Sequence, residues 1–253
     1  MGCKFCASTL NGRVRNLTPS EILGQVAAAT RDTGERISGI VMMGIGEPLD
    51  NYDNTVRFLH LVNRADGLNI GYRHISLSTC GVVPGMERLA AEKLPITLSV
   101  SLHAATDEVR SALMPVNRKW NIARLMQACV DYYRATGRRI SFEYTLISGK
   151  NDREEDARQL AGLLKGTLGR AGAPLHVNLI RVNEVKERAY KRPGTETANR
   201  FAALLGKYGV NATVRRRLGA DVDAACGQLR RRAAEEAAQA AGKDRAQPCT
   251  ATE

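Results

Sequence analysis

Two thiols near the start of the chain have the residue type and spacing of a metal or redox site. Cys3 and Cys6 are separated by two residues, and small side chains follow them at positions 7–9. Pairs with this spacing bind zinc, exchange disulfides or ligate iron–sulfur clusters, so the spacing alone leaves all three open. Phe5 between the thiols and the small residues after them are typical of a loop folded tightly over a cluster. We therefore interpret Cys3 and Cys6 as cluster ligands.

A second group of residues falls at the ends of predicted β-strands, where parallel α/β barrels gather their reactive groups. Gly46 lets a ligand approach the backbone closely, and the Glu47 carboxylate can accept hydrogen bonds from an ammonium group. Short polar side chains suit a carboxylate or a ribose. The candidates at four strand ends are Gly46, Glu47, Ser78, Ser101, Leu102, His103 and Asn183. Their common placement predicts a ligand site at one edge of the sheet.

The elements that must position these residues alternate along the chain. Short β-type runs at 39–43, 74–78, 97–101, 140–146 and 176–181 are separated by amphipathic helical stretches, which predicts parallel strands joined by crossover helices. A further β run at 211–215 follows them. A strand before Cys3 would complete six parallel strands. The predicted fold is therefore α/β, a partial (β/α)6 barrel that lacks its first strand.

Local signals give more detailed expectations for some elements. Residues 18–21 combine an N-cap, a proline at the first helical position and a capping-box Glu, and Gly34 ends that helix. Residues 39–43 predict a strand buried on both faces. The helix expected at 152–164 is capped by Asp152 and Glu155. Two apolar stripes are expected to be buried: Ile22, Val26 and Ala29 in the first helix, and Ile122, Leu125, Met126, Cys129 and Tyr133 in a helix at 121–136.

Composition narrows the class of protein. The chain has 253 residues, of which 43% are hydrophobic, and 37 Lys and Arg against 26 acidic residues give a net charge of +11. This balance favours a polyanionic partner over an acidic surface, with nucleic acid as the leading candidate and a soluble basic protein as the alternative. No apolar run reaches bilayer length, and the six unevenly spaced cysteines do not suggest a secreted disulfide framework. We expect a cytoplasmic protein without membrane contact.

Five segments together carry a family resemblance. They are residues 3–7 around the thiols, 42–49 ending in Gly46-Glu47-Pro48-Leu49, 77–84, 101–104 and 223–229 around Cys226. The combination resembles the RlmN family of radical S-adenosylmethionine methyltransferases, from about Gly2 to Leu229. That family methylates C2 of an adenosine in 23S rRNA and, in many members, in tRNA.

The resemblance implies a set of roles and partners. Cys3 and Cys6 would be the second and third ligands of a [4Fe-4S] cluster, the seven strand-end residues would hold S-adenosylmethionine, and Cys226 would be the cysteine that carries the methyl group. A radical removes hydrogen from that methyl, and the carbon radical adds to C2 of adenosine. A further cysteine then resolves the adduct through a disulfide, aided by a base, and in the family both lie upstream. The resemblance further implies a monomer that receives electrons from a flavodoxin or ferredoxin.

The family signature Cys-x3-Cys-x2-Cys also places its first cysteine two residues before Met1. We therefore expect Met1 to be an internal methionine of a longer protein, and the 253-residue chain to fold but to lack activity. The expected organisation is a barrel domain at 1–229 and a basic, alanine-rich tail at 230–253 that is disordered or a fraying helix. Cys249 in that tail is interpreted as a surface thiol.

Other interpretations stay open at this level. One is the related activity that methylates adenosine C8 and confers antibiotic resistance, and another is an inactive truncated relative that only binds RNA. Cys80 and Cys129 are interpreted as packing residues, because one adjoins a glycine and the other lies on an apolar helix face. The basic runs 118–119 and 215–217 are either RNA phosphate contacts or solvated surface.

Overall fold

The computed structural model describes residues 1–10, 12–185 and 187–216. Cys226, Arg217, Cys249 and the tail predicted at 230–253 lie outside the described residues. A single sheet organises the described part, with six strands in the order of the sequence and every neighbouring pair parallel. The strands are β1 (Ile40–Met42), β2 (Ile75–Thr79), β3 (Thr97–Ser101), β4 (Ile140–Leu146), β5 (His176–Arg181) and β6 (Asn211–Val214).

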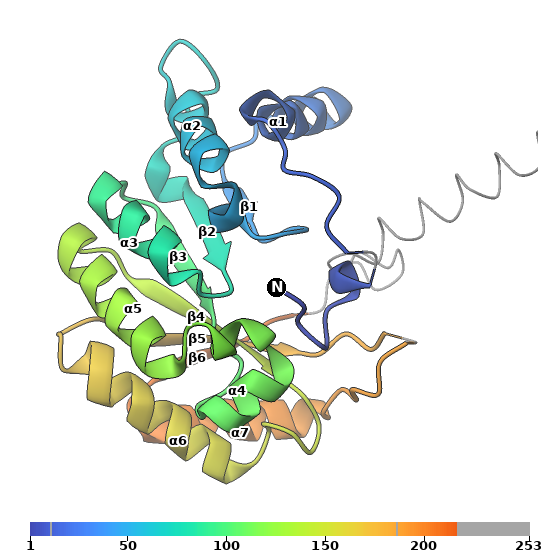
Figure 1. Ribbon diagram of the computed structural model, residues 1–253, viewed down its shortest axis with the longest axis vertical. Helices are drawn as coiled ribbons and strands as arrows, with labels where there is room; N and C mark the ends of the chain where they lie inside the picture. The colour runs from blue at the N-terminus through green and yellow to red at the C-terminus, as the bar shows by residue number, and fades with distance from the viewer. Residues whose placement is uncertain (11, 186, 217–253) are drawn as a thin grey trace, which may run out of the picture.

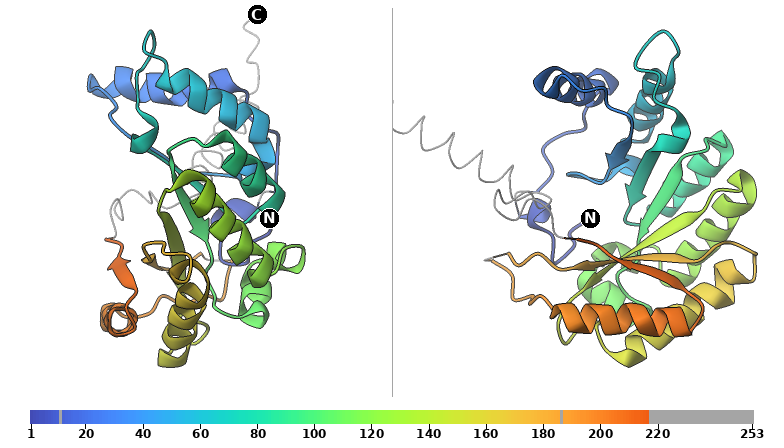
Figure 2. Two further views of the ribbon diagram at one scale, coloured as in Figure 1. Left: turned by 90° about the vertical axis from the view of Figure 1, so that its left-hand side faces the viewer. Right: turned by 180° about the vertical axis from the view of Figure 1, so that it is seen from behind.

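Helices cover the outer face of this curved sheet (Figures 1 and 2). They are α2 (Tyr52–Asn63), α3 (Val83–Glu92), α5 (Ile122–Thr136), α6 (Glu154–Leu164) and α7 (Thr195–Lys207), while α1 (Pro19–Thr33) packs against α2 and α4 (Asp107–Leu113) follows β3. Short helical turns span Ala7–Thr9, Pro48–Asn51, Tyr72–His74, Pro115–Arg118 and Lys165–Gly169. The N-terminal segment lies on the inner side of the sheet (Figure 1).

The predicted fold class, a partial α/β barrel of parallel strands, is confirmed. The run predicted at 211–215 proves to be a strand of the sheet itself, because β6 pairs in parallel with β5 from His176↔Asn211 to Leu179↔Val214. No backbone pairing joins β6 to β1 among the described residues, so the sheet curves without closing.

The prediction that 39–43 is buried on both faces is wrong. In β1 the side chain of Val41 is 64% exposed, while Ile40 and Met42 are half-buried. A one-sided edge strand explains this, since β1 has a neighbour only at β2 and its inner face looks into the open part of the barrel.

The first helix begins and ends as its sequence signals predict. Thr18 and Glu21 form the capping box, and Gly34 ends α1 in the left-handed conformation with φ of 70°. The expected stripe of α1 is confirmed only in part: Ile22 and Val26 are half-buried and pack against the core, but no residue of α1 is fully buried. The physical reason is position: α1 leans on α2 at the margin of the fold and does not reach the sheet (Figure 1).

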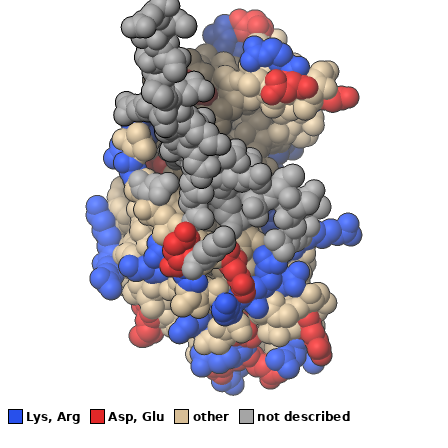
Figure 3. Space-filling view, turned by 90° about the vertical axis from the view of Figure 1, so that its right-hand side faces the viewer, with Lys and Arg blue, Asp and Glu red and all other residues tan. Residues whose placement is uncertain are grey.

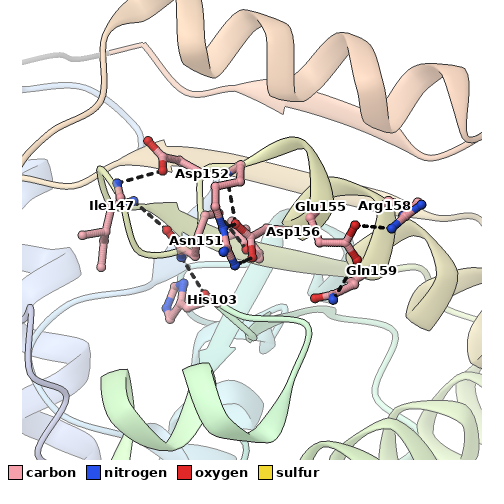
Figure 4. Close-up of polar contacts among 11 residues, drawn as sticks. His103, Ile147, Asn151, Asp152, Glu155, Asp156, Arg158 and Gln159 are labelled. Carbon is pink, nitrogen blue, oxygen red and sulfur yellow. Dashed lines mark hydrogen bonds and ion pairs between the residues drawn. The ribbon is translucent and has the colours of Figure 1, made fainter.

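Two other helices depart from the expected details. In α5 the predicted face is buried except for the half-buried Tyr133, and Tyr132 is fully buried in its place. At α6 the caps differ, because Asp156 accepts from the backbone N–H of Arg153 at 3.0 Å, whereas Asp152 accepts from Gly149 at 2.8 Å. Glu155 bonds Arg158 and Gln159 on the outer surface instead (Figure 4). Asp156 stands at the third helical position, from which a carboxylate reaches the N-terminal N–H groups.

The two faces of the sheet differ in chemistry, and this difference places the core. Apolar side chains of β2 to β5, such as Leu77, Leu98, Phe142 and Leu179, are buried beneath the helices. The alternate positions point into the barrel and are largely polar, including Ser76, Ser99 and Ser141. None of the described helices is long and apolar enough to span a bilayer. The strand period of two therefore separates a packing face from a ligand face.

Candidate active site

The cysteine loop is a tight turn held by its own backbone and by α4. The N–H of Cys6 donates to the carbonyl of Cys3 at 3.3 Å, and the Thr9 hydroxyl donates to both cysteine carbonyls, at 3.1 Å and 2.8 Å. The N–H of Lys4 donates to the Leu113 carbonyl at the end of α4, at 2.9 Å. The loop thus presents two free, half-buried thiols at the inner side of the sheet.

The donor set of this loop fits part of an iron–sulfur site. Burial, followed by the neighbouring Cys6, raises the pKa of Cys3 to about 11, and the charge of Arg110 acts against this rise. Burial disfavours the thiolate of Cys3, and bound iron would supply a positive centre that stabilises it. Among the described residues no group of three or more His, Cys, Asp or Glu could hold a metal ion. The described residues therefore offer two thiols as candidate ligands.

The first predicted strand end carries Glu47 in a specific position. One of its carboxylate oxygens accepts from the N–H of Leu49 at 3.0 Å, and the other from the N–H of Cys80 at 2.7 Å, so it ties the β1 loop to the end of β2. Burial raises the pKa of Glu47, and these hydrogen bonds oppose the rise. Gly46 beside it has φ of 102° and open space around its Cα, so the backbone conformation is what requires glycine.

The turn after β3 is the most constrained part of the site. His103 adopts φ of 57°, its Nδ1 accepts from the N–H of Thr145 at 2.9 Å, and its carbonyl accepts from Asn151 Nδ2 at 2.7 Å (Figure 4). Nδ1 is therefore unprotonated, and burial lowers the pKa of His103 to about 3. The rings of Phe5 and His103 pack edge-to-face, with 5.0 Å between their centroids. This contact brings the cysteine loop against the strand-end turn.

The other predicted ligands lie along the same edge. Ser78 and Ser101 are half-buried on the inner face of β2 and β3. Leu102 is fully buried and both its backbone groups are engaged, the N–H with the Glu143 carbonyl at 3.0 Å and the carbonyl with Arg110 at 3.1 Å. Asn183, just beyond β5, accepts from Arg192 at 2.7 Å. The structure thus places all seven predicted residues at the carboxyl ends of the strands.

Sequence reasoning missed three residues that shape this edge. Glu143 on β4 points into the barrel and accepts from Asn178 at 2.8 Å, and burial raises its pKa. Arg110 and Asn151 are fully buried and bind backbone groups of the strand ends. The alternation of polar residues in β4 could have indicated Glu143. A charged residue on a helix and an asparagine in a turn gave no comparable signal, because both are usually exposed.

The predicted packing thiols are both buried. Cys129 is fully buried in α5, which confirms its interpretation as a core residue, and Cys80 is 9% exposed at the end of β2. Burial raises the pKa of each of these two thiols above the ordinary value of a cysteine. The arrangement as a whole can hold an anionic metal group at the loop and a polar ligand across the strand ends.

Comparison with known proteins agrees with this arrangement. Residues 1–161 match the Radical SAM superfamily. The chain is 58% identical over 232 residues to a "Probable dual-specificity RNA methyltransferase RlmN" of Desulforamulus reducens, and 56% identical over 234 residues to the protein of the same name in Pelotomaculum thermopropionicum. Both alignments cover 92% of the chain but only 65% and 62% of those relatives, so the chain spans less than two thirds of their length.

A solved structure of a radical SAM methyltransferase also resembles this chain in its fold. A radical SAM methyltransferase from Sphaerobacter thermophilus superposes with a TM-score of 0.84 at 46% identity, covering 90% of this chain and 66% of that one.

Proposed function

Because this chain belongs to the radical SAM superfamily, we propose that it forms the cofactor-binding barrel of an RNA methyltransferase that methylates C2 of adenosine. The proposed substrate is 23S rRNA, with tRNA as a second substrate. The observation that carries the proposal is the contact between Phe5 and His103, which joins the cysteine loop to the strand-end ligand site. The names of the relatives support RNA as the substrate.

In this proposal the predicted site residues hold or orient the cofactors. Cys3 and Cys6 ligate a [4Fe-4S] cluster, and the site extends over the strand ends to hold S-adenosylmethionine. Bound there, the two cofactors supply an electron, a methyl group and a carbon-centred radical. Glu47, fixed by Leu49 and Cys80, accepts from the ammonium of S-adenosylmethionine.

The remaining strand-end residues have different proposed roles, which follow from their side chains. Gly46 leaves room for the ligand, the hydroxyls of Ser78 and Ser101 bind its carboxylate or ribose, and Asn183 supplies an amide. Leu102 and His103 shape the turn, since the backbone groups of Leu102 are used within the protein. Because burial keeps His103 neutral, its ring adds no positive charge to the strand-end ligand site.

Cys226 is proposed as the thiol that carries the methyl group, and it lies outside the described residues. Adenine C2 is an electron-poor carbon, so a radical route through a methylated cysteine suits it better than direct displacement. C2 is preferred over C8 because the relatives that we compare bear the RlmN name. The barrel domain is proposed to extend over 1–229.

The partners are proposed from charge and chemistry. The net charge of +11 suits RNA, and Lys and Arg side chains are spread over the face seen in Figure 3, with acidic residues between them. Arg118, Lys119, Arg215 and Arg216 are exposed and could contact phosphates. We propose that the protein works in the cytoplasm as a monomer and receives electrons from a flavodoxin or ferredoxin.

The test uses the protein expressed from its complete reading frame, reconstituted anaerobically with iron and sulfide. Incubation with methyl-labelled S-adenosylmethionine should place label on the peptide that contains Cys226, and an rRNA fragment should then yield 2-methyladenosine. Cys6→Ala should lose the cluster absorption and the RNA product, whereas Cys129→Ala, a change in the core, should keep both. Label on another cysteine, or 8-methyladenosine as product, would contradict the proposal.

A further inference from the structure

Arg110 is a buried cation that the proposed function leaves unexplained. It is 0% exposed at the inner side of α4. Its guanidinium donates to the carbonyls of Cys80 at 2.8 Å, Ser101 at 3.2 Å and Leu102 at 3.1 Å, and to Asn117 Oδ1 at 2.8 Å. All four acceptors are neutral.

This arrangement satisfies the hydrogen bonds of the guanidinium but leaves its charge without a direct partner. None of the ion pairs formed by the described residues includes Arg110. The nearest acid in its network is Asp107, which Asn117 connects to it: Asn117 Nδ2 donates to the Asp107 carboxylate at 2.8 Å. A charge removed from water without a counter-ion is costly, so a fold retains one where an anionic partner arrives later or where the charge has a task.

The position of Arg110 indicates where an anionic partner of its charge would bind. Of its three carbonyl acceptors, Ser101 ends β3, Leu102 follows it, and Cys80 follows β2, so one side chain joins the two strand ends. The same helix accepts the N–H of Lys4, inside the cysteine loop, at Leu113. Arg110 therefore lies between the strand ends and the helix that holds the cysteine loop, and the anionic group would be one bound at that loop.

The guanidinium is closely packed against the turn that follows β2. A side-chain carbon on Gly81 would come within 3.3 Å of Arg110 Nη2 and 2.9 Å of Leu125, and Gly81 itself has φ of 97°. The guanidinium therefore lies in contact with the backbone that follows β2. A fork of five donors suits such a cluster of carbonyls, whereas a lysine could reach only part of it.

We propose that Arg110 is a positioning residue of the cofactor site: it clamps the ends of β2 and β3 into the ligand-binding shape and supplies the buried positive charge that faces the anionic thiolate-bound cluster. The proposal rests on the proposed function, since it assumes that Cys3 and Cys6 ligate the cluster. Uptake of one electron from a low-potential reductant adds one negative charge at the cysteine loop. A fixed cation behind the loop favours that reduced state, and the protein does not have to reorganise to provide it.

The test measures the midpoint potential of the cluster by electron paramagnetic resonance, at fixed reductant potentials, in the anaerobically reconstituted protein from the complete reading frame. Arg110→Gln removes the charge and should make the midpoint more negative. Asp107→Asn removes the acid of the network and keeps its acceptor oxygen for Asn117 and Ile122, so it should move the midpoint in the opposite direction. Arg124→Gln, the same charge change on the exposed face of α5, should leave it unchanged.

A second readout tests the clamp. Arg110→Lys keeps the charge but loses most of the carbonyl contacts, so it should bind labelled S-adenosylmethionine roughly tenfold more weakly with a smaller shift in midpoint than Arg110→Gln. If Arg110→Gln fails to retain its cluster, the shift in Asp107→Asn decides the question. Midpoints in Asp107→Asn and Arg110→Gln that equal the wild-type value, or that move in the same direction, would overturn the proposal. Absence of 2-methyladenosine in the unmodified protein would instead contradict the proposed function and leave the potentials measurable.

Discussion

Replacing Asn151 by alanine should loosen the turn that carries His103. Asn151 is 0% exposed and its side chain makes three hydrogen bonds to backbone groups of two segments (Figure 4). Nδ2 donates to the carbonyls of His103 at 2.7 Å and Thr145 at 2.8 Å, and Oδ1 accepts from the N–H of Ile147 at 2.8 Å. Alanine leaves all three backbone groups without these partners at a site closed to water.

The magnitude follows from the number of bonds and the burial. A buried hydrogen bond to a neutral group contributes about 1 to 1.5 kcal/mol, so the loss of three predicts that the free energy of unfolding falls by about 3 to 4.5 kcal/mol. The ordinary range is about 5 to 15 kcal/mol, and a domain well inside this range stays mostly folded at 25 °C after such a loss. The effect on the site should therefore be measurable in folded protein.

Urea unfolding followed by circular dichroism gives the change in stability. Asn63→Ala is the matched control, because Asn63 makes one hydrogen bond, to the Ile70 carbonyl at 3.2 Å, at a half-buried position, and should cost about 1 kcal/mol. Asn151→Ala should also bind S-adenosylmethionine more weakly in the reconstituted protein, since His103 loses the partner of its carbonyl. Asn63→Ala should not.

A loss of stability in Asn151→Ala no larger than in Asn63→Ala would refute the reasoning, because it would mean that the three backbone groups find other partners. A large loss of stability with unchanged binding of S-adenosylmethionine would show that the turn keeps its shape without Asn151.

The other predictions concern the core, a buried base and a buried thiol. Gly85→Ala places a carbon 2.8 Å from Leu49 and should cost about 1 to 3 kcal/mol in urea unfolding, whereas Gly162→Ala, with nothing within 4 Å, should be neutral or stabilising. Folding lowers the pKa of His103 from 6.5 to about 3, so between these pH values only the unfolded chain binds the proton. The free energy of unfolding should therefore be largest above about pH 6.5 and fall by up to about 1.4 kcal/mol for each pH unit below that. His103→Asn should flatten this slope. Cys129 should resist iodoacetamide until urea unfolds the protein, as peptide mass spectrometry would reveal.

The sequence determined those features that depend on short stretches of chain. The capping box at Thr18 and Glu21 and the glycine at position 34 set the ends of α1 without help from other elements. The runs at 97–101, 140–146 and 176–181 coincide with β3, β4 and β5, because β-branched and apolar residues with flanking turns leave little choice of conformation. The tendency of parallel α/β barrels to gather reactive groups at the carboxyl ends of their strands also predicted the edge of the sheet at which the candidate ligands lie.

Tertiary structure alone decided which residues are buried and what they touch. Val41 is exposed because β1 has one neighbour, and Ile22 is only half-buried because α1 stops short of the sheet. Arg110 and Asn151 are buried because residues distant in sequence offer them backbone carbonyls, and no local pattern specifies such partners. Helix and turn signals act over a few residues, whereas burial and hydrogen-bond satisfaction depend on contacts between segments that only the folded chain brings together.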